Sequence, residues 1–206
     1  MATAQVPASY APIDNAPPAP PARPRVVVIA TAFAAGGCLA FFVAIVGLYL
    51  TMRAAANAAG QAWIPEDAVI PMPQPNVMLF ALLMSSVTMH WAVWAIKRDD
   101  RPHAYLALGI TGLFGFAILN MAAYLYSLMH LDAAAPTPMP LLTYTITGAH
   151  LLMLVAALVF GALMAFRALG GQFNARQHDG IAAAELFWHA QVIVFMFIWY
   201  AIYITK

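Results

Sequence analysis

The sequence predicts an all-α integral membrane protein, a bundle of five transmembrane helices. Hydrophobic residues make up 64% of the 206 residues and charged residues only 8%, whereas a soluble domain carries about 25% charged residues. The apolar residues gather in five stretches, each near or above the roughly 20 residues that cross a bilayer. Lipid offers no hydrogen-bond partner to the backbone, so such stretches form helices rather than open strands.

The five predicted spans, in chain order, are residues 26–52, 77–96, 104–129, 139–166 and 181–204. The longer spans exceed the thickness of the hydrocarbon region, which predicts tilt or helix ends that rise above the membrane. Small residues in the first two spans favour close helix contact: Gly36, Gly37, Gly47, Ser85 and Ser86. The chain therefore divides into a tail, residues 1–25, and one five-helix domain, residues 26–206.

Two segments outside the spans are rich in proline. Residues 1–25 bury too little to fold and predict a disordered tail. Residues 53–76 form the first loop, where the prolines predict an extended strap on the membrane surface rather than regular helix. Trp63 in this strap is expected at the headgroup level.

Basic residues predict the orientation. Seven of the nine fall on one side of the bundle, before the first span and in the second and fourth loops. The positive-inside rule therefore places the N-terminus in the cytoplasm and the C-terminus outside. A net charge of +1 provides no strong positive electrostatic field that would attract nucleic acid. The single cysteine, Cys38, excludes an intrachain disulfide and a Cys/His zinc pattern.

Four ionisable residues inside the spans are functional candidates, because such groups are costly in lipid: His90, His150, Glu185 and His189. Glu185 and His189 are four residues apart and share one helical face. We expect them to form an interhelical polar clamp, in which His150 meets His189 across the bundle and His90 is a third partner. Two alternatives stay open, a metal site made of the histidines and Glu185, and a haem held by two histidines.

The stretch from Thr147 to His189 resembles subunit III of the haem–copper oxidases. That family has T-G-x-H, an arginine at the end of the same helix, a phenylalanine in the loop, H-x-G, and W-H in the last helix. The corresponding residues here are Thr147-Gly148-Ala149-His150, Arg167, Phe173, His178-Asp179-Gly180 and Trp188-His189. Weaker support comes upstream from Trp63-Ile64-Pro65, Pro75-Asn76 and Ser85-Ser86. Five helices match the short members, which lack the first two helices of the seven-helix form.

The resemblance implies a non-redox accessory subunit of a membrane haem–copper terminal oxidase. Such a subunit packs against catalytic subunit I and subunit II, which hold the haem and copper. It binds phospholipid in a cleft between helices, and it supports proton uptake and oxygen access. The expected membrane is the bacterial cytoplasmic membrane, and we expect no catalytic residue, metal or cofactor in this chain. The interhelical or lipid-cleft candidates are His90, His150, Glu185, His189, Arg167, His178 and Trp188.

Four positions depart from the family pattern and indicate a divergent member. Met153 replaces a second histidine, Ala182 a glutamate, and Val192 an aspartate, and Ala123 stands where a Q-x-x-E-Y run has its carboxylate. An accessory subunit of a nitric oxide reductase, which belongs to the same family, is therefore an alternative. A small membrane cytochrome or metal protein is another.

Overall fold

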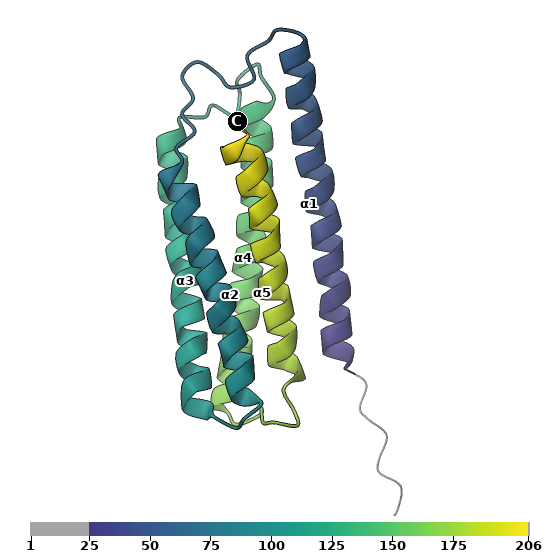
Figure 1. The fold of residues 1–206 in the computed structure, drawn as a ribbon, viewed down its shortest axis with the longest axis vertical. Coiled ribbons are helices and arrows are strands. Elements are labelled where there is room, and N and C mark those ends of the chain that lie inside the picture. Colours follow the sequence, from purple (N-terminus) through teal and green to yellow (C-terminus); the bar gives the residue numbers. More distant parts are fainter. Residues whose placement is uncertain (1–24, 206) are drawn as a thin grey trace, which may run out of the picture.

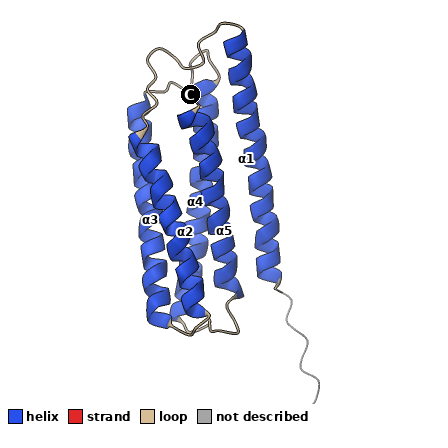
Figure 2. Cartoon of the chain, in the orientation of Figure 1, coloured by secondary structure: helices blue, strands red, loops and turns tan. Residues whose placement is uncertain are grey.

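The predicted five-helix fold is confirmed by a computed structural model that describes residues 25–205. The helices are α1 (Val26–Ala58), α2 (Pro73–Ile96), α3 (Arg101–Met129), α4 (Met139–Leu169) and α5 (Asp179–Ile198), and a π-helical turn η2 (Trp199–Ile204) continues α5. The described residues contain no strand (Figure 2). The predicted tail, residues 1–25, lies outside the described residues except for Arg25.

Helix α5 occupies the middle of the bundle, and it contacts α1, α2 and α4 (Figure 1). Of its most apolar stretch, 56% is buried, against 11% for α1, which stands at the edge. The side chains that α5 carries therefore meet three different neighbours, while α1 exposes most of its surface.

Large apolar side chains cover the outside of the spans. Phe33 is 80% exposed, Leu113 70% and Leu152 73%. A water-soluble protein rarely exposes a continuous apolar surface of this kind. All five helices are long and apolar enough to cross a membrane, so the fold fits a bilayer and not an aqueous surrounding.

The first loop is shorter than predicted. Helix α1 continues to Ala58, and α2 begins at Pro73, although we expected residues 53–76 to be free of regular helix. The expectation was wrong at Pro73 and Pro75 because the first helical turn tolerates proline, whose missing N–H would have no partner there. Trp63 in this loop is buried within the chain, and its position at the headgroup level stays a prediction. Its indole N–H donates to the Tyr49 hydroxyl at 3.1 Å.

Both ends of α1 are tied to the last part of the chain. Arg25, just before α1, forms an ion pair of 2.7 Å with Asp179 at the start of α5. At the other end, Arg53 donates to the carbonyl and hydroxyl of Thr205. The start of α1 and the C-terminus consequently lie at opposite ends of the bundle (Figure 1). Which end faces the cytoplasm stays a prediction.

Candidate functional site

Two adjacent serines of α2 bond to two adjacent residues of α5. The indole N–H of Trp188 donates to Ser85 Oγ at 2.9 Å, and Ser85 in turn donates to the Leu82 carbonyl. One residue further along each helix, Ser86 Oγ lies 2.5 Å from His189 Nδ1. These two hydrogen bonds link α5 to α2. The serines supply hydrogen bonds as well as the small size that we expected of them.

Glu185 lies between two histidines. Its Oε1 is 2.5 Å from His90 Nδ1 on α2 and 3.5 Å from His189 Nε2, one turn along α5. The Glu185 side chain is 15% exposed, whereas that of His90 is 66% exposed. His90 is six residues from the end of α2 and Glu185 six residues from the start of α5. At 1.5 Å per residue, both sit about 9 Å inside the helix ends.

His150 does not meet His189, contrary to our expectation. Its ring is buried between Phe42 and Phe195, and its Nε2 lies 3.0 Å from the Gln191 carbonyl. Two side chains that are two residues apart on a helix are separated by about 200° of rotation around the helix axis, so they point in nearly opposite directions. Position 191 of α5 therefore faces α4 while position 189 faces α2.

Gln191 is a buried polar residue that sequence reasoning passed over. The residue is fully buried, and neither side-chain polar atom has a hydrogen-bond partner among the described residues. In the sequence, Gln191 received no interpretation of its own. It directly precedes Val192, which stands where the family has an aspartate. A glutamine beside a W-H pair in an apolar span was the available signal.

Arg167 and His178 lie at the end of the bundle where α1 begins. Arg167, in the last turn of α4, donates to Gln172 Oε1 at 2.7 Å and lies over the Phe173 ring. His178 precedes α5, and its Nδ1 is 3.0 Å from the Ala175 carbonyl. These contacts lie within the loop between α4 and α5, and neither side chain is among the partners of Glu185.

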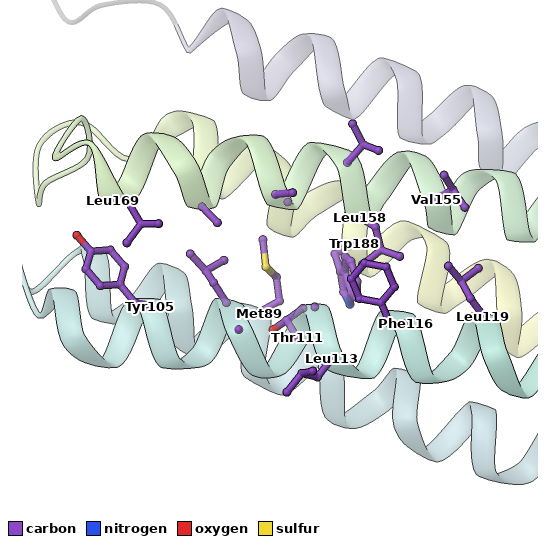
Figure 3. A pocket seen from close by; sticks show the side chains of 17 residues that line it. Met89, Tyr105, Thr111, Leu113, Phe116, Leu119, Val155, Leu158, Leu169 and Trp188 are labelled. Atoms are coloured by element: carbon purple, nitrogen blue, oxygen red, sulfur yellow. The ribbon is translucent and has the colours of Figure 1, made fainter.

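A cleft of about 620 Å³ lies mainly between α3 and α4, and Figure 3 shows the side chains around it. Its walls are almost wholly apolar, with Met89 and Trp188 reaching in from α2 and α5. Three glycines line the cleft and face open space, since a Cβ added to any of them would meet no atom within 4 Å: Gly109, Gly112 and Gly161.

One turn beyond Gly112 the same two helices close up. A Cβ on Gly115 would lie 2.5 Å from Leu158 Cδ2 and 3.1 Å from the Trp188 ring. The Tyr105 hydroxyl donates to the Ala168 carbonyl at 3.0 Å. The Tyr105 hydrogen bond lies at one end of the cleft, whereas Leu119 and Val155 still line the cleft beyond the Gly115 contact (Figure 3).

Fold and site together define an integral membrane helix bundle with a few interior polar groups and one apolar cleft. Residues 28–206 match the family described as "Cytochrome c oxidase subunit III". The chain belongs to that family.

Relatives named cytochrome c oxidase subunit 3 come from bacteria and animals. The protein from Synechocystis sp. is 29% identical over 146 residues, which cover 69% of this chain and 62% of the relative. The protein from Thermostichus vulcanus is 27% identical over 70% of this chain and 72% of its own length. The protein from Sus scrofa is 28% identical over 70% of this chain and 56% of its own length. The match therefore spans little more than half of several relatives.

Proposed function

We propose that this chain is a non-redox accessory subunit of a membrane haem–copper terminal oxidase. It packs against catalytic subunit I and subunit II, which hold the haem and copper, and stabilises them during aerobic electron transport. The family match over residues 28–206 carries this proposal. An all-helical bundle whose interior polar groups mostly bond to one another supports a scaffold rather than a catalyst.

Phospholipid is the proposed occupant of the cleft between α3 and α4. The volume of about 620 Å³ lies within the roughly 300–1,000 Å³ of small-molecule sites, and the lining is apolar, as an acyl chain requires. Arg167 stands two residues before Leu169, which lines one end of the cleft. A cationic group at that end favours an anionic headgroup.

Oxygen access and support of proton uptake are the remaining parts of the proposal. Oxygen is apolar, so a lipid-filled cleft offers it a route through the bundle towards a catalytic subunit. For protons, Glu185 with His90 and His189 places exchangeable groups about 9 Å inside the helix ends. The proposed membrane is the bacterial cytoplasmic membrane, with the N-terminus inside.

A subunit of a nitric oxide reductase is a second candidate, favoured by the missing family carboxylates at Ala123, Ala182 and Val192. The cytochrome alternative is less well supported. His150 is buried and bonded to the Gln191 carbonyl, and Glu185 lies against both His90 and His189, where a haem would have to enter.

Purification of the tagged chain from its native membrane in mild detergent tests the proposal. We expect haem bands in the optical spectrum together with a large haem–copper catalytic subunit in the mass spectrum. A catalytic partner of the nitric-oxide-reducing type would favour the second candidate instead. Haem bands without a partner would indicate a cytochrome, and a chain that runs alone without haem would contradict the oxidase assignment.

A further inference from the structure

Three metal-binding side chains meet at one place in the bundle, from residues that are far apart in the sequence. One ligand atom each from His90, Glu185 and His189 lie within 4.8 Å of one another. We infer that these residues bind a divalent transition-metal ion, with Zn²⁺ as the best-fitting example. This inference concerns side chains of this chain alone and does not rest on the oxidase assignment.

The charge around Glu185 is the first observation that favours a bound metal ion. Among the described residues, Glu185 has ion-pair partners only in the two histidines, and no lysine or arginine reaches it. A carboxylate that stays ionised inside a membrane span needs a positive charge close by. A proton shared with His90 is one source of that charge. A divalent ion is another, and it uses all three side chains at once.

The distances from Glu185 to the two histidines also favour a bound metal ion. Zn²⁺ binds histidine nitrogen and carboxylate oxygen at about 2.0–2.2 Å, so two tetrahedral ligands stand about 3.4 Å apart. The Glu185 Oε1 to His189 Nε2 separation is 3.5 Å. The distance between Glu185 Oε1 and His90 Nδ1 is 2.5 Å, so these two atoms have to move apart by about 1 Å when zinc binds. His90 is exposed, so its side chain is free to make that movement.

The orientation of His189 is the third argument. Its Nδ1 is held by the Ser86 hydroxyl at 2.5 Å, which turns Nε2 towards Glu185. Metal-binding histidines commonly donate the N–H of the other nitrogen to an oxygen acceptor, which fixes the tautomer and the ring direction. Ser86 supplies that oxygen.

The donor set selects the class of ion. Two imidazoles and one carboxylate suit zinc and other first-row divalent ions, whereas magnesium and calcium require oxygen ligands. The exposed side of His90 leaves room for a further ligand, which is water or a group of another subunit. Three protein ligands with one open position are typical of an accessible zinc site.

Zinc content and ligation provide the test. The full chain, with whatever co-purifies from its native membrane, is stripped with a chelator and titrated with ZnCl₂. We expect one more bound zinc per chain in the wild type than in Glu185→Gln or His90→Gln, and X-ray absorption that shows two imidazoles. Ser86→Ala should weaken binding about 10- to 100-fold. The matched control is His103→Gln, which alters an exposed His–carboxylate pair with Asp100 that has no third ligand.

Equal zinc binding by the wild type, Glu185→Gln and His90→Gln would overturn the inference and leave a hydrogen-bonded polar clamp. Thermal denaturation of each variant checks that a loss of zinc does not come from unfolding, and His90→Gln is the safer variant because its side chain is exposed. Zinc is counted per chain. A failure of the oxidase assignment would therefore change the co-purifying subunits and leave the zinc count as it is.

Discussion

Trp188 and Ser85 are 103 residues apart in the chain and bond to each other in the buried contact between α5 and α2, at 2.9 Å. The indole N–H has no other hydrogen-bond acceptor among the described residues, and the ring also forms part of the wall of the cleft (Figure 3). The same bond therefore fixes the packing of two helices and the shape of the proposed lipid site.

Replacing Ser85 by alanine should destabilise the bundle, because the Trp188 N–H loses its acceptor in an apolar surrounding. The expected cost is about 1 kcal/mol, the scale of interhelical hydrogen bonds in membranes. Thermal denaturation in detergent measures it. Ser127→Ala is the control, since Ser127 is exposed and bonds to a carbonyl of its own helix. Equal midpoints for the two variants would show that the Trp188 bond contributes nothing.

His189→Ala should weaken retention of the subunit in its complex and leave the haem spectrum unchanged. The side chain links α5 to α2 through Ser86, and its loss costs about 1 kcal/mol by the same comparison. Subunit ratios after a detergent wash report retention, with His103→Ala as the control. A change in haem absorption would instead assign His189 a role as a haem ligand.

The close contact at Gly115 should resist any added volume. Gly115→Ala places a methyl group against Leu158 and Trp188, and overpacking of this kind costs about 1–3 kcal/mol. Gly112→Ala, one turn away and facing the cleft, should be tolerated. Adding Leu158→Ala to Gly115→Ala should recover part of the loss, as measured by thermal denaturation. Equal effects of the two glycine variants would contradict the contact.

Filling the cleft should displace its lipid. Gly161→Leu projects into the cleft, whereas Gly148→Leu on the same helix does not, and neither glycine has an atom near its Cβ position. Mass spectrometry of co-purified phospholipid should therefore show less bound lipid for Gly161→Leu alone. If both variants retain the wild-type amount of lipid, the cleft is not the lipid site.

Asp100, which lies outside the membrane spans, should make the stability of the fold depend on pH. The hydrogen bond from His103 lowers the pKa of this carboxyl below its ordinary 3.8, and the carboxylate also caps α3 by accepting from the His103 N–H. Because the folded pKa lies below the unfolded value, the stabilisation is complete above 3.8. It is lost as the pH falls through the lower, folded value.

Asp100→Asn keeps an acceptor for the cap and removes the charge. The variant should therefore show a smaller loss of stability than the wild type when the pH is lowered through this range. Acid denaturation followed by circular dichroism measures the difference. Parallel curves for the two proteins would show that Asp100 is not responsible.

The five helices could be predicted from the sequence because length and hydropathy alone determine them in lipid. Helix ends were less predictable. Proline reads as a helix breaker, yet Pro73 and Pro75 lie in the first turn of α2, where proline is tolerated. The π-helical turn Trp199–Ile204 has no signal in the hydropathy pattern.

The partners of the polar residues depended on helix rotation, which one sequence does not reveal. Glu185 and His189 share a face by their spacing alone, and His90 was named as a partner. The expected contact with His150 failed because α5 turns position 191, not position 189, towards α4. Gln191 was passed over because a lone amide carries no recognisable spacing.

Native mass spectrometry of the complex purified with the tagged chain can show whether this chain is a haem-free accessory subunit. We expect collisional activation to release this chain free of haem from a particle that retains a haem–copper catalytic subunit. Release of the chain with haem attached, or the absence of any catalytic subunit from the particle, would contradict the assignment as an accessory subunit.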